Sequence, residues 1–288
     1  MGGERTMNRK VKQGSKITRI ILRIILLFLT IIMVYPLIWN IIASLKSNEE
    51  ILESPWTLPD VLHFENFVRA FTEANIGGYV FNSILVTVLS LSIMLILAIP
   101  SSYVIGRFNF PGRKFLHNFF LAGLFIQPIL IMVPLFLLVN DMKITNNLFS
   151  LSIIYAITNI SFSIYLLIGF MKTIPKEYEE AAVIDGCGYI STLIRVIIPL
   201  AKPGIITVSI FNFFTFWNEY ALALVLITSD EKKTIPVGLV NLMEVQRYAT
   251  DWSALFAGLV IVLIPTVVIY IFVHKKLTEG MMMGGIKG

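Results

Sequence analysis

Long apolar runs constrain this chain more than any other feature of its sequence. Six stretches are long enough to cross the hydrocarbon core of a bilayer as a helix, which takes roughly 20 residues. They are Ile24–Leu45, Phe81–Ile105, Phe115–Val139, Leu148–Phe170, Gly204–Ile227 and Ser253–Val273. The runs are continuous and show no two-residue alternation, so helices are expected rather than barrel strands. The sequence predicts an all-α membrane protein with six transmembrane helices.

Composition and charge support this prediction and exclude some classes of function. Charged residues make up 14% of the chain and hydrophobic residues 56%, which is far from the balance of a soluble domain. The net charge of +5 does not indicate a nucleic-acid partner, because the basic residues flank the apolar runs as they do on the cytoplasmic side of membrane proteins. The single cysteine, Cys187, allows no disulfide within the chain.

The distribution of lysine and arginine predicts the orientation of the chain. With both termini in the cytoplasm, 17 of the 23 lysines and arginines fall in cytoplasmic segments and 6 in outer segments, as the positive-inside rule expects. The chain then consists of a basic cytoplasmic N-terminus, a six-helix transmembrane domain and a cytoplasmic tail. These occupy residues 1–23, 24–273 and 274–288, with an extracytoplasmic loop at 47–80 and a cytoplasmic loop at 171–203.

The outer loop 47–80 is too long for a simple connection between two spans. It carries six acidic residues, two prolines and Trp56. Either it stays a solvated loop, or it folds in part and contacts a partner outside the cell. The sequence leaves both interpretations open.

The cytoplasmic loop contains the most polar stretch between spans, where Tyr178–Gly188 reads YEEAAVIDGCG. Pro175 suits the start of a helix, and the glutamates after it lie where the positive end of a helix dipole favours anions. Gly186 and Gly188 then provide a stop, because glycine adopts left-handed dihedral angles at low cost. A first short helix is therefore expected over the glutamates and alanines.

A second short helix is expected from about Ser191, and Pro199 and Pro203 are expected to end it before the fifth span. Its apolar stripe consists of Ile190, Leu193, Ile194 and Ile197. Two helices around a glycine turn form a compact element on which a partner can dock. An amphipathic loop helix can equally lie on the lipid headgroups, so residue chemistry alone leaves both readings open.

The residues of this loop resemble the EAA loop of bacterial ATP-binding-cassette importer permeases. Glu180-Ala181-Ala182 is followed after three residues by Gly186 and, nine residues later, by Val196-Ile197-Ile198-Pro199, where the family usually has Ile-x-Leu-Pro. Other stretches resemble the carbohydrate branch, in particular the smaller permease subunit of maltose-type importers. They are SLKSNEEIL, Asn82-Ser83, YVIGRFNFPGRK, QPILIMVPLFLL, FMKTIPKEYEEAA, FWNEYALAL, TIPVGLV and GGIKG. The resemblance covers nearly the whole chain.

The resemblance implies the fold and partners of a type I importer permease in the bacterial cytoplasmic (inner) membrane. In that family the loop is a coupling helix that sits in a cleft of the ATPase subunit and transmits ATP-driven closure to the spans. Carried over to this chain, the coupling residues are Glu180, Ala181, Ala182, Asp185, Gly186 and Pro199. The implied partners are a second homologous permease subunit, two ATP-binding-cassette ATPase subunits, an extracytoplasmic sugar-binding protein and membrane lipid.

Motifs for catalysis and metal binding are missing from the sequence. There is no G-x-x-x-x-G-K-[ST] stretch to cradle phosphates, so we expect no enzyme activity and no cofactor bound by this chain, with ATP and Mg used by the partner ATPases. His63, His117 and His274 are scattered, and with one cysteine no metal site is expected. Since no nucleophile motif such as G-x-S-x-G is found, no catalytic residue is assigned.

Glu219 is the one acidic residue within the spans, and it follows Trp217 and Asn218. A charge inside a span usually faces the protein interior or a water path. One interpretation places the three residues on the substrate path, where the indole stacks on a sugar and the amide and carboxylate accept its hydroxyls. The other is a structural bond between helices, or a carboxylate near the outer surface that faces water.

Residues and resemblance together predict one permease subunit of an ATP-driven importer of a sugar of oligosaccharide type, forming half of the translocation path. One alternative is an importer permease for a non-sugar solute such as a phosphate ester. Another is a secondary transporter driven by an ion gradient. That class would show ionisable residues near the middle of spans, often in paired repeats, and this sequence offers only Glu219.

Overall fold

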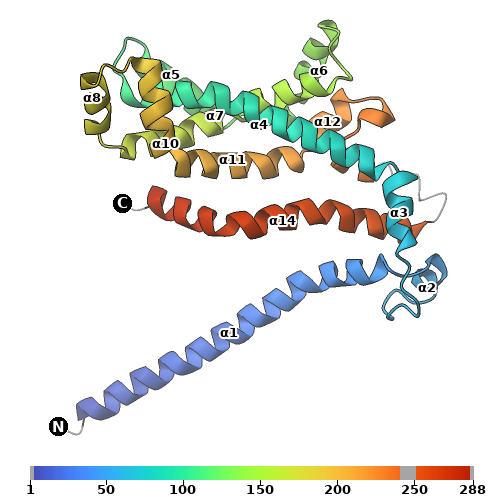
Figure 1. Ribbon diagram of the computed structural model, residues 1–288. Helices are drawn as coiled ribbons and strands as arrows, with labels where there is room; N and C mark the ends of the chain where they lie inside the picture. The colour runs from blue at the N-terminus through green and yellow to red at the C-terminus, as the bar shows by residue number, and fades with distance from the viewer. Residues whose placement is uncertain (1–2, 241–250, 286–288) are drawn as a thin grey trace.

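The computed structural model describes residues 3–240 and 251–285, with side chains described for residues 18–240 and 251–271. Every regular element in this part of the chain is helical. The molecule is elongated, and its long helices run roughly along it (Figure 1). The predicted all-α class is therefore confirmed.

Four helices are long and apolar enough to cross a membrane. They lie in α1 (Gly3–Ala43), α4 (Ile76–Arg107), α7 (Leu148–Thr173) and α14 (Trp252–Gly285). Two further candidate spans are bent. One joins α5 (Arg113–Gly123) through the turn η1 (Pro128–Ile131) to α6 (Met132–Asp141) at 91°, and the other joins residues 189–200 to α11 (Lys202–Trp217) at 76°. Six spans result when each bent pair counts as one.

Two expected spans are broken. The third, Phe115–Val139, is interrupted between α5 and η1, because Pro128 has no amide with which to continue a helix. The fifth, Gly204–Ile227, consists of α11 and a separate short helix, α12 (Ala221–Leu226). The break between them contains Asn218 and Glu219, the polar residues that stood out in the sequence.

Helix extends beyond the expected spans at both ends of the chain. α1 begins at Gly3 and passes without interruption through the expected boundary at residue 24. The expected tail 274–288 continues α14 as helix to Gly285, while residues 286–288 lie outside the described part of the chain. α1 begins and α14 ends at the end of the molecule where α8 (Glu177–Ile184) lies (Figure 1).

α4 and α7 form the centre of the bundle, since they pack against each other along most of their lengths. Small buried side chains allow this close approach; they include Ser90, Ala98, Ser102, Ala156 and Ser163. α11 lies against both helices, and Nδ2 of Asn212 on α11 donates to Oγ of Ser163 at 3.0 Å. α14 packs on α11 and on α3 (Glu65–Thr72).

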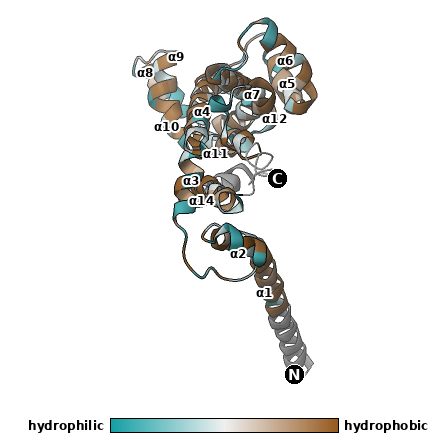
Figure 2. Ribbon diagram, turned by 90° about the vertical axis from the view of Figure 1, so that its right-hand side faces the viewer, coloured by the Kyte–Doolittle hydropathy of each residue, from teal (hydrophilic) through white to brown (hydrophobic). Residues whose placement is uncertain are grey.

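α1 diverges from this bundle, as both views show (Figures 1 and 2). No residue of its most apolar 18-residue window is buried. Its outer end is held by Trp39, whose Nε1 donates to O of Pro55 at 2.8 Å and whose ring packs edge to face on Phe256 at 5.2 Å. An apolar helix so exposed needs lipid or another protein subunit around it.

The outer loop 47–80 is partly folded, which decides one of the two points that the sequence left open. α2 (Asn48–Glu53) starts with a capping box, in which Ser47 and Glu50 each bond the backbone N–H of the other. The fully buried Lys46 beside it donates from Nζ to O of Ser54 and to both oxygens of Thr57, at 2.7–3.0 Å. Contact of this loop with an outside partner stays a prediction.

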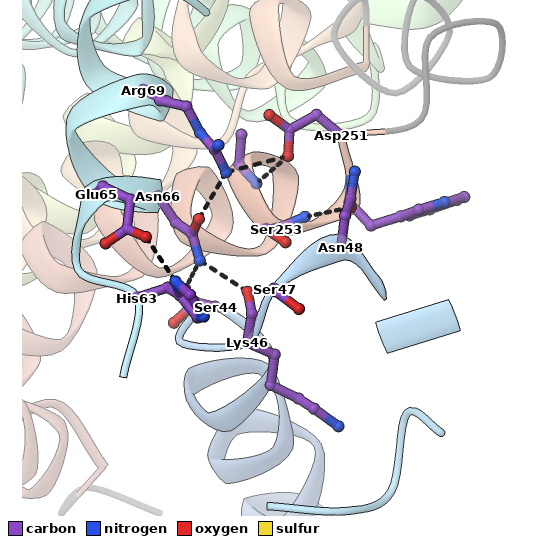
Figure 3. Close-up of polar contacts among 12 residues, drawn as sticks. Ser44, Lys46, Ser47, Asn48, His63, Glu65, Asn66, Arg69, Asp251 and Ser253 are labelled. Carbon is purple, nitrogen blue, oxygen red and sulfur yellow. Dashed lines mark hydrogen bonds and ion pairs between the residues drawn. The ribbon is translucent and has the colours of Figure 1, made fainter. Parts of the chain in front are cut away.

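Asn66 and Arg69 on α3 tie the outer end of α1 to the start of α14 (Figure 3). Nδ2 of Asn66 donates to the carbonyls of Ser44 and Lys46, both at 2.9 Å. Arg69 donates to Oδ1 of Asn66 at 2.6 Å and lies 3.6 Å from Oδ1 of Asp251. Three helices far apart in sequence are thereby joined by two side chains.

Candidate functional site

The cytoplasmic loop 171–203 folds as two helical arms around a glycine turn. The first arm is α8, and three glutamates lie in its first turn, as the sequence predicts. At its end the N–H of Gly186 donates to O of Val183 at 3.0 Å and that of Cys187 to O of Ala182 at 2.8 Å. This is the Schellman arrangement, in which the residue after the helix is left-handed. Gly186 has φ of 80°, and no atom lies within 4 Å of the place where a Cβ would be. Backbone conformation, rather than lack of space, therefore requires glycine here.

The second arm consists of α9 (Tyr189–Thr192), η2 (Leu193–Ile197) and α10 (Ile198–Leu200), so it starts two residues before the expected Ser191. The arm ends at Leu200, between Pro199 and Pro203 and before the fifth span, as the sequence predicts. The turn η2 is π-helical, and this wide geometry accommodates a proline that lacks an amide and would clash with the carbonyl four residues earlier. Pro203 lies in the first turn of α11.

A buried arginine, Arg107, connects the first arm to the spans. It is the last residue of α4, and its Nε donates to Oε1 of Glu179 at 2.9 Å. Its Nη1 donates to the carbonyls of Met171 and Ile174, at 3.2 and 2.7 Å, where α7 ends. The arginine side chain is 5% exposed and that of Glu179 20%. One guanidinium thus joins the ends of two spans to α8 through charge-assisted bonds.

Sequence reasoning missed Arg107 as a site residue. It explained the glutamates of the loop only by their place at the start of a helix, whereas Glu179 also pairs with a span of the same chain. The available signal was an arginine at the cytoplasmic end of an apolar run, in YVIGRFNFPGRK. That signal was interpreted as a general membrane flank.

Apolar side chains seat the second arm on the bundle. Ile197 is fully buried among Tyr103, Met171 and Ile174, and Leu193 packs against the same cluster. The other half of the predicted stripe does not face the bundle, because Ile190 and Ile194 are exposed. The arm therefore offers part of its apolar surface to something outside this chain.

The turn between the arms carries an exposed apolar tip. Its residues are Val183, Ile184 and Tyr189, and Ile184 is 85% exposed. The acidic residues Glu180 and Asp185 beside them are also exposed. An exposed apolar group with a polar rim indicates a contact surface for another molecule. Sequence reasoning missed this tip, because apolar residues of a short helix are expected to face inward.

Five of the six predicted coupling residues lie at the surface of this loop: Glu180, Ala181, Asp185, Gly186 and Pro199. Ala182 is buried and faces the protein. A hollow of about 460 Å³ lies between α8 and the end of α4, lined among others by Tyr103, Phe108 and Cys187. Figure 1 shows α8 at the opposite end of the molecule from α2, α3 and α12.

The structure places Trp217 and Asn218 differently from each other. Trp217 is 2% exposed and its ring stacks on Phe213 at 5.6 Å. Its Nε1 is buried and has no acceptor among the described residues. The side chain of Asn218 is exposed, and its Nδ2 donates to O of Phe214 on its own helix at 2.8 Å.

Glu219 holds the start of α12. Its carboxylate accepts from the backbone N–H groups of Leu222 and Ala223, at 2.8 and 3.1 Å, and from the Tyr155 hydroxyl on α7 at 2.5 Å. These three bonds match the structural interpretation of Glu219. A place on the substrate path stays a prediction for all three residues.

In the part of the chain that the structure describes, no three His, Cys, Asp or Glu residues gather to hold a metal ion. Cys187 is a half-buried free thiol. His274, one of the scattered histidines, lies outside the described side chains.

Comparison with known proteins gives concordant matches. The family model of the binding-protein-dependent transport system inner membrane component matches residues 78–281. The diacetylchitobiose uptake system permease protein NgcG of Streptomyces coelicolor is 35% identical over 260 residues, which are 90% of this chain and 86% of the relative. The arabinooligosaccharides transport system permease protein AraQ of Halalkalibacterium halodurans is 30% identical over 96% of this chain and 99% of its own.

A solved structure shares the fold. One chain in the crystal structure of a bacterial ABC transporter involved in the import of the acidic polysaccharide alginate superposes with a TM-score of 0.81. The match covers 91% of this chain and 97% of that chain at 24% identity. The likeness supports the fold.

Proposed function

This chain belongs to the family of binding-protein-dependent transport system inner membrane components, and we propose that it is one permease subunit of an ATP-driven importer of an oligosaccharide. Membership makes it a multi-pass protein of the bacterial inner membrane and a transport component. The names of its relatives refer to diacetylchitobiose and arabinooligosaccharides. Neither a non-sugar importer nor an ion-driven secondary transporter is favoured by these relatives.

The construction of the coupling loop carries this proposal. An exposed apolar tip stands on α8, and Arg107 connects α8 to the ends of α4 and α7. A partner that moves the tip would therefore move two spans. In this proposal Glu180, Ala181, Asp185 and Gly186 form the docking face, while Ala182 packs inward and Pro199 shapes the second arm.

The partners proposed are two ATP-binding-cassette ATPases at the coupling loop, a second homologous permease subunit and an extracytoplasmic sugar-binding protein. The family itself implies a complex with ATPase and binding-protein components. The exposed apolar surface of α1 supports the second permease subunit, since it is not covered by this chain. ATP and Mg would be bound by the ATPases, and this chain would have no ATPase site and no cofactor of its own.

The substrate path is proposed to pass near the break between α11 and α12. Trp217 has an indole N–H without an acceptor among the described residues, so a change of conformation could offer it to a sugar hydroxyl. The variant Glu219→Gln distinguishes a role on the substrate path from a role in stabilising the fold. A path role predicts a raised KM for uptake, whereas a purely structural role predicts a lower melting temperature with unchanged KM. Wild-type uptake kinetics would remove Glu219 from the path.

Reconstitution tests the function as a whole. The chain would be purified with the permease, ATPase and binding protein encoded beside it, and placed in proteoliposomes with ATP on the ATPase side. Labelled diacetylchitobiose and arabino-oligosaccharides would be compared with a phosphate ester. We expect sugar uptake that requires ATP and the binding protein and is insensitive to a proton ionophore. Uptake that is abolished by the ionophore and proceeds without ATP would contradict the proposal.

A further inference from the structure

A second cavity, of about 580 Å³ and with a polar lining, lies at the cytoplasmic ends of α5 and α7. Its polar lining consists of Asn109, Arg113, Lys114, His117, Asn118 and Lys172. No carboxylate lines it, although three of these side chains are permanent cations at neutral pH. It shares no lining residue with the hollow beneath the coupling turn.

The cations of this cavity have two different tasks. Arg113 is fixed by the chain itself: Nε donates to O of Ile105 at 2.8 Å, Nη2 to O of Gly106 at 3.1 Å and Nη1 to Oδ1 of Asn109 at 2.5 Å. These bonds close the end of α4 and form a rigid wall. Lys114 and Lys172, by contrast, form no ion pair with any described residue. Two ammonium groups are therefore left to neutralise an anion from outside the chain.

The position of the cavity along the spans suits a lipid headgroup. Lys172 lies in the last turn of α7, and Lys114 is the second residue of α5, directly before its apolar run. Next to the cations, the rings of Phe115 and Phe119 are 71% and 61% exposed and stack on each other at 6.3 Å. Exposed phenylalanine rings beside basic residues suit the boundary between headgroups and acyl chains, where the rings pack on lipid and the cations face the headgroups.

We propose that this cavity binds the phosphate of an anionic phospholipid of the cytoplasmic leaflet. Lys114 and Lys172 contact the phosphate, the amides of Asn109 and Asn118 contact the headgroup, and the acyl chains lie over Phe115 and Phe119. Basic pockets between spans on the cytoplasmic side recognise lipids in this way. The bound lipid bridges α5 to α7. The proposal rests on the cytoplasmic placement of the coupling loop in the proposed function, but not on ATP coupling or on the sugar.

The test measures lipid binding rather than transport. The intact complex, purified in a neutral detergent, is titrated with phosphatidylglycerol or phosphatidylcholine, and bound lipids are counted by native mass spectrometry. The double variant Lys114→Gln/Lys172→Gln removes both free cations. The matched control, Lys176→Gln/Lys202→Gln, removes the same charge from exposed positions on the same side of the membrane, outside the cavity.

We expect the cavity variant to bind phosphatidylglycerol about tenfold more weakly than wild type, because each basic residue near the surface contributes to the attraction of anionic lipid. The control variant should bind it like wild type, and phosphatidylcholine should bind weakly to all three. Where the double variant yields no folded complex, Lys172→Gln alone should weaken binding by about threefold.

Three outcomes would overturn the proposal. Equal loss in the cavity and control variants would show general surface charge. Equal binding of phosphatidylcholine would show that the anion is not recognised. Displacement of phosphatidylglycerol by millimolar inorganic phosphate would assign the cavity to a free anion instead of a lipid. Failure of sugar uptake leaves all three readouts unaffected, so the two proposals fail separately.

Discussion

At the outer end of the molecule, side-chain amides bind the backbone of the short turn and connecting segment between longer helices, whereas at the cytoplasmic end a guanidinium binds α8 to the spans. Nδ2 of Asn82 donates to the carbonyls of Glu231 and Lys233, at 2.8 and 3.0 Å. Oδ1 of Asn146 accepts from the N–H groups of Thr228 and Ser229, at 3.3 and 3.1 Å. Among the described residues, Arg107–Glu179 is the one ion pair that joins α8 to a span.

These two kinds of contact suit different roles: the outer end holds the spans together, and the coupling loop passes motion from a partner to the spans. Backbone that leaves the helix near a membrane has to be satisfied by other groups of the protein, and at the outer end many short-range bonds do this at once. Such an end should be rigid. At the cytoplasmic end, α8 is bound to the spans by the Arg107–Glu179 ion pair and its apolar tip stays exposed, so α8 can instead transmit a displacement as a unit. Changes at the outer end should therefore lower stability and leave coupling intact, whereas changes at the cytoplasmic end should alter the ratio of ATP hydrolysed to sugar imported.

Removal of the connection at the cytoplasmic end should have the largest effect. Arg107→Met removes the partner of Glu179 and the side-chain donor to the carbonyls of Met171 and Ile174, so we expect a loss of about 2–3 kcal/mol in unfolding free energy. The number of ATP molecules hydrolysed per sugar should rise strongly, because α8 no longer moves with α4 and α7. Thermal unfolding and parallel ATPase and uptake assays measure both effects.

Glu179→Gln is the milder companion of this variant. Its amide oxygen still accepts from Nε of Arg107, so the effect should be a fraction of that of Arg107→Met. A double-mutant cycle should show clear non-additivity, because the two residues share one bond. Additive effects on the coupling ratio would mean that the ion pair does not transmit motion.

Two matched substitutions in the glycine turn separate the effect of backbone strain from the effect of added bulk. A Cβ at Gly186 or at Gly188 meets open space, but only Gly186 has a positive φ. Gly186→Val should cost about 1–2 kcal/mol of strain and reduce uptake by about tenfold while ATP hydrolysis continues. Gly188→Val has the same new bulk without the strain. Equal loss of uptake in both variants would point to steric exclusion at the docking face instead of turn geometry.

At the outer end, Asn82→Ala removes two bonds, one to O of Glu231 in the 3-10 turn η3 (Asp230–Lys232) and one to O of Lys233 directly after it. We expect a loss of about 1–2 kcal/mol in unfolding free energy with an unchanged ratio of ATP to sugar. Asn140→Ala, the same substitution at an exposed position of α6, serves as control. A changed number of ATP molecules hydrolysed per sugar in Asn82→Ala would contradict a purely structural role for the outer end.

The smallest expected effect concerns acid stability at the same outer segment. A hydrogen bond from Nζ of Lys233 lowers the pKa of Asp230, and a bond from the Tyr79 hydroxyl adds to this. Because the folded-state pKa is depressed, the stabilisation is present above the ordinary aspartate pKa and is lost as pH falls through the folded value. The difference in melting temperature between wild type and Asp230→Asn should therefore be constant near neutrality and shrink below about pH 4. A difference independent of pH would show that charge has no part in it.

Local signals were enough to predict the helices and the glycine turn. The long apolar runs, the glutamates at the start of α8 and Gly186 each act through neighbouring residues, and the structure agrees with them. The prolines also predicted the end of the second arm, which lies at Leu200 between Pro199 and Pro203. The π-helical turn before Pro199 was not predicted, because no local rule specifies it.

Long-range partners could not be predicted from one sequence. Arg107 meets Glu179 across 72 positions, and Glu219 meets Tyr155 across 64. Nothing in the pattern of either segment specifies these pairs, because they depend on how spans pack. The exposed tip at Val183 and Ile184 was missed because apolar residues of a short helix are expected to face inward, and whether they do depends on how the helix packs.

The most direct test of docking by the coupling loop uses the single cysteine of the chain, Cys187, which lines the hollow beneath the glycine turn. The intact complex would carry cysteines engineered around the cleft of its ATPase, and disulfide crosslinks to Cys187 would be measured with and without ATP, with Cys187→Ser as control. We expect crosslinks in wild type, with a yield that changes when ATP is added, and no crosslinks in Cys187→Ser. An absence of crosslinks at every cleft position, in a complex shown to be assembled, would contradict docking by this loop.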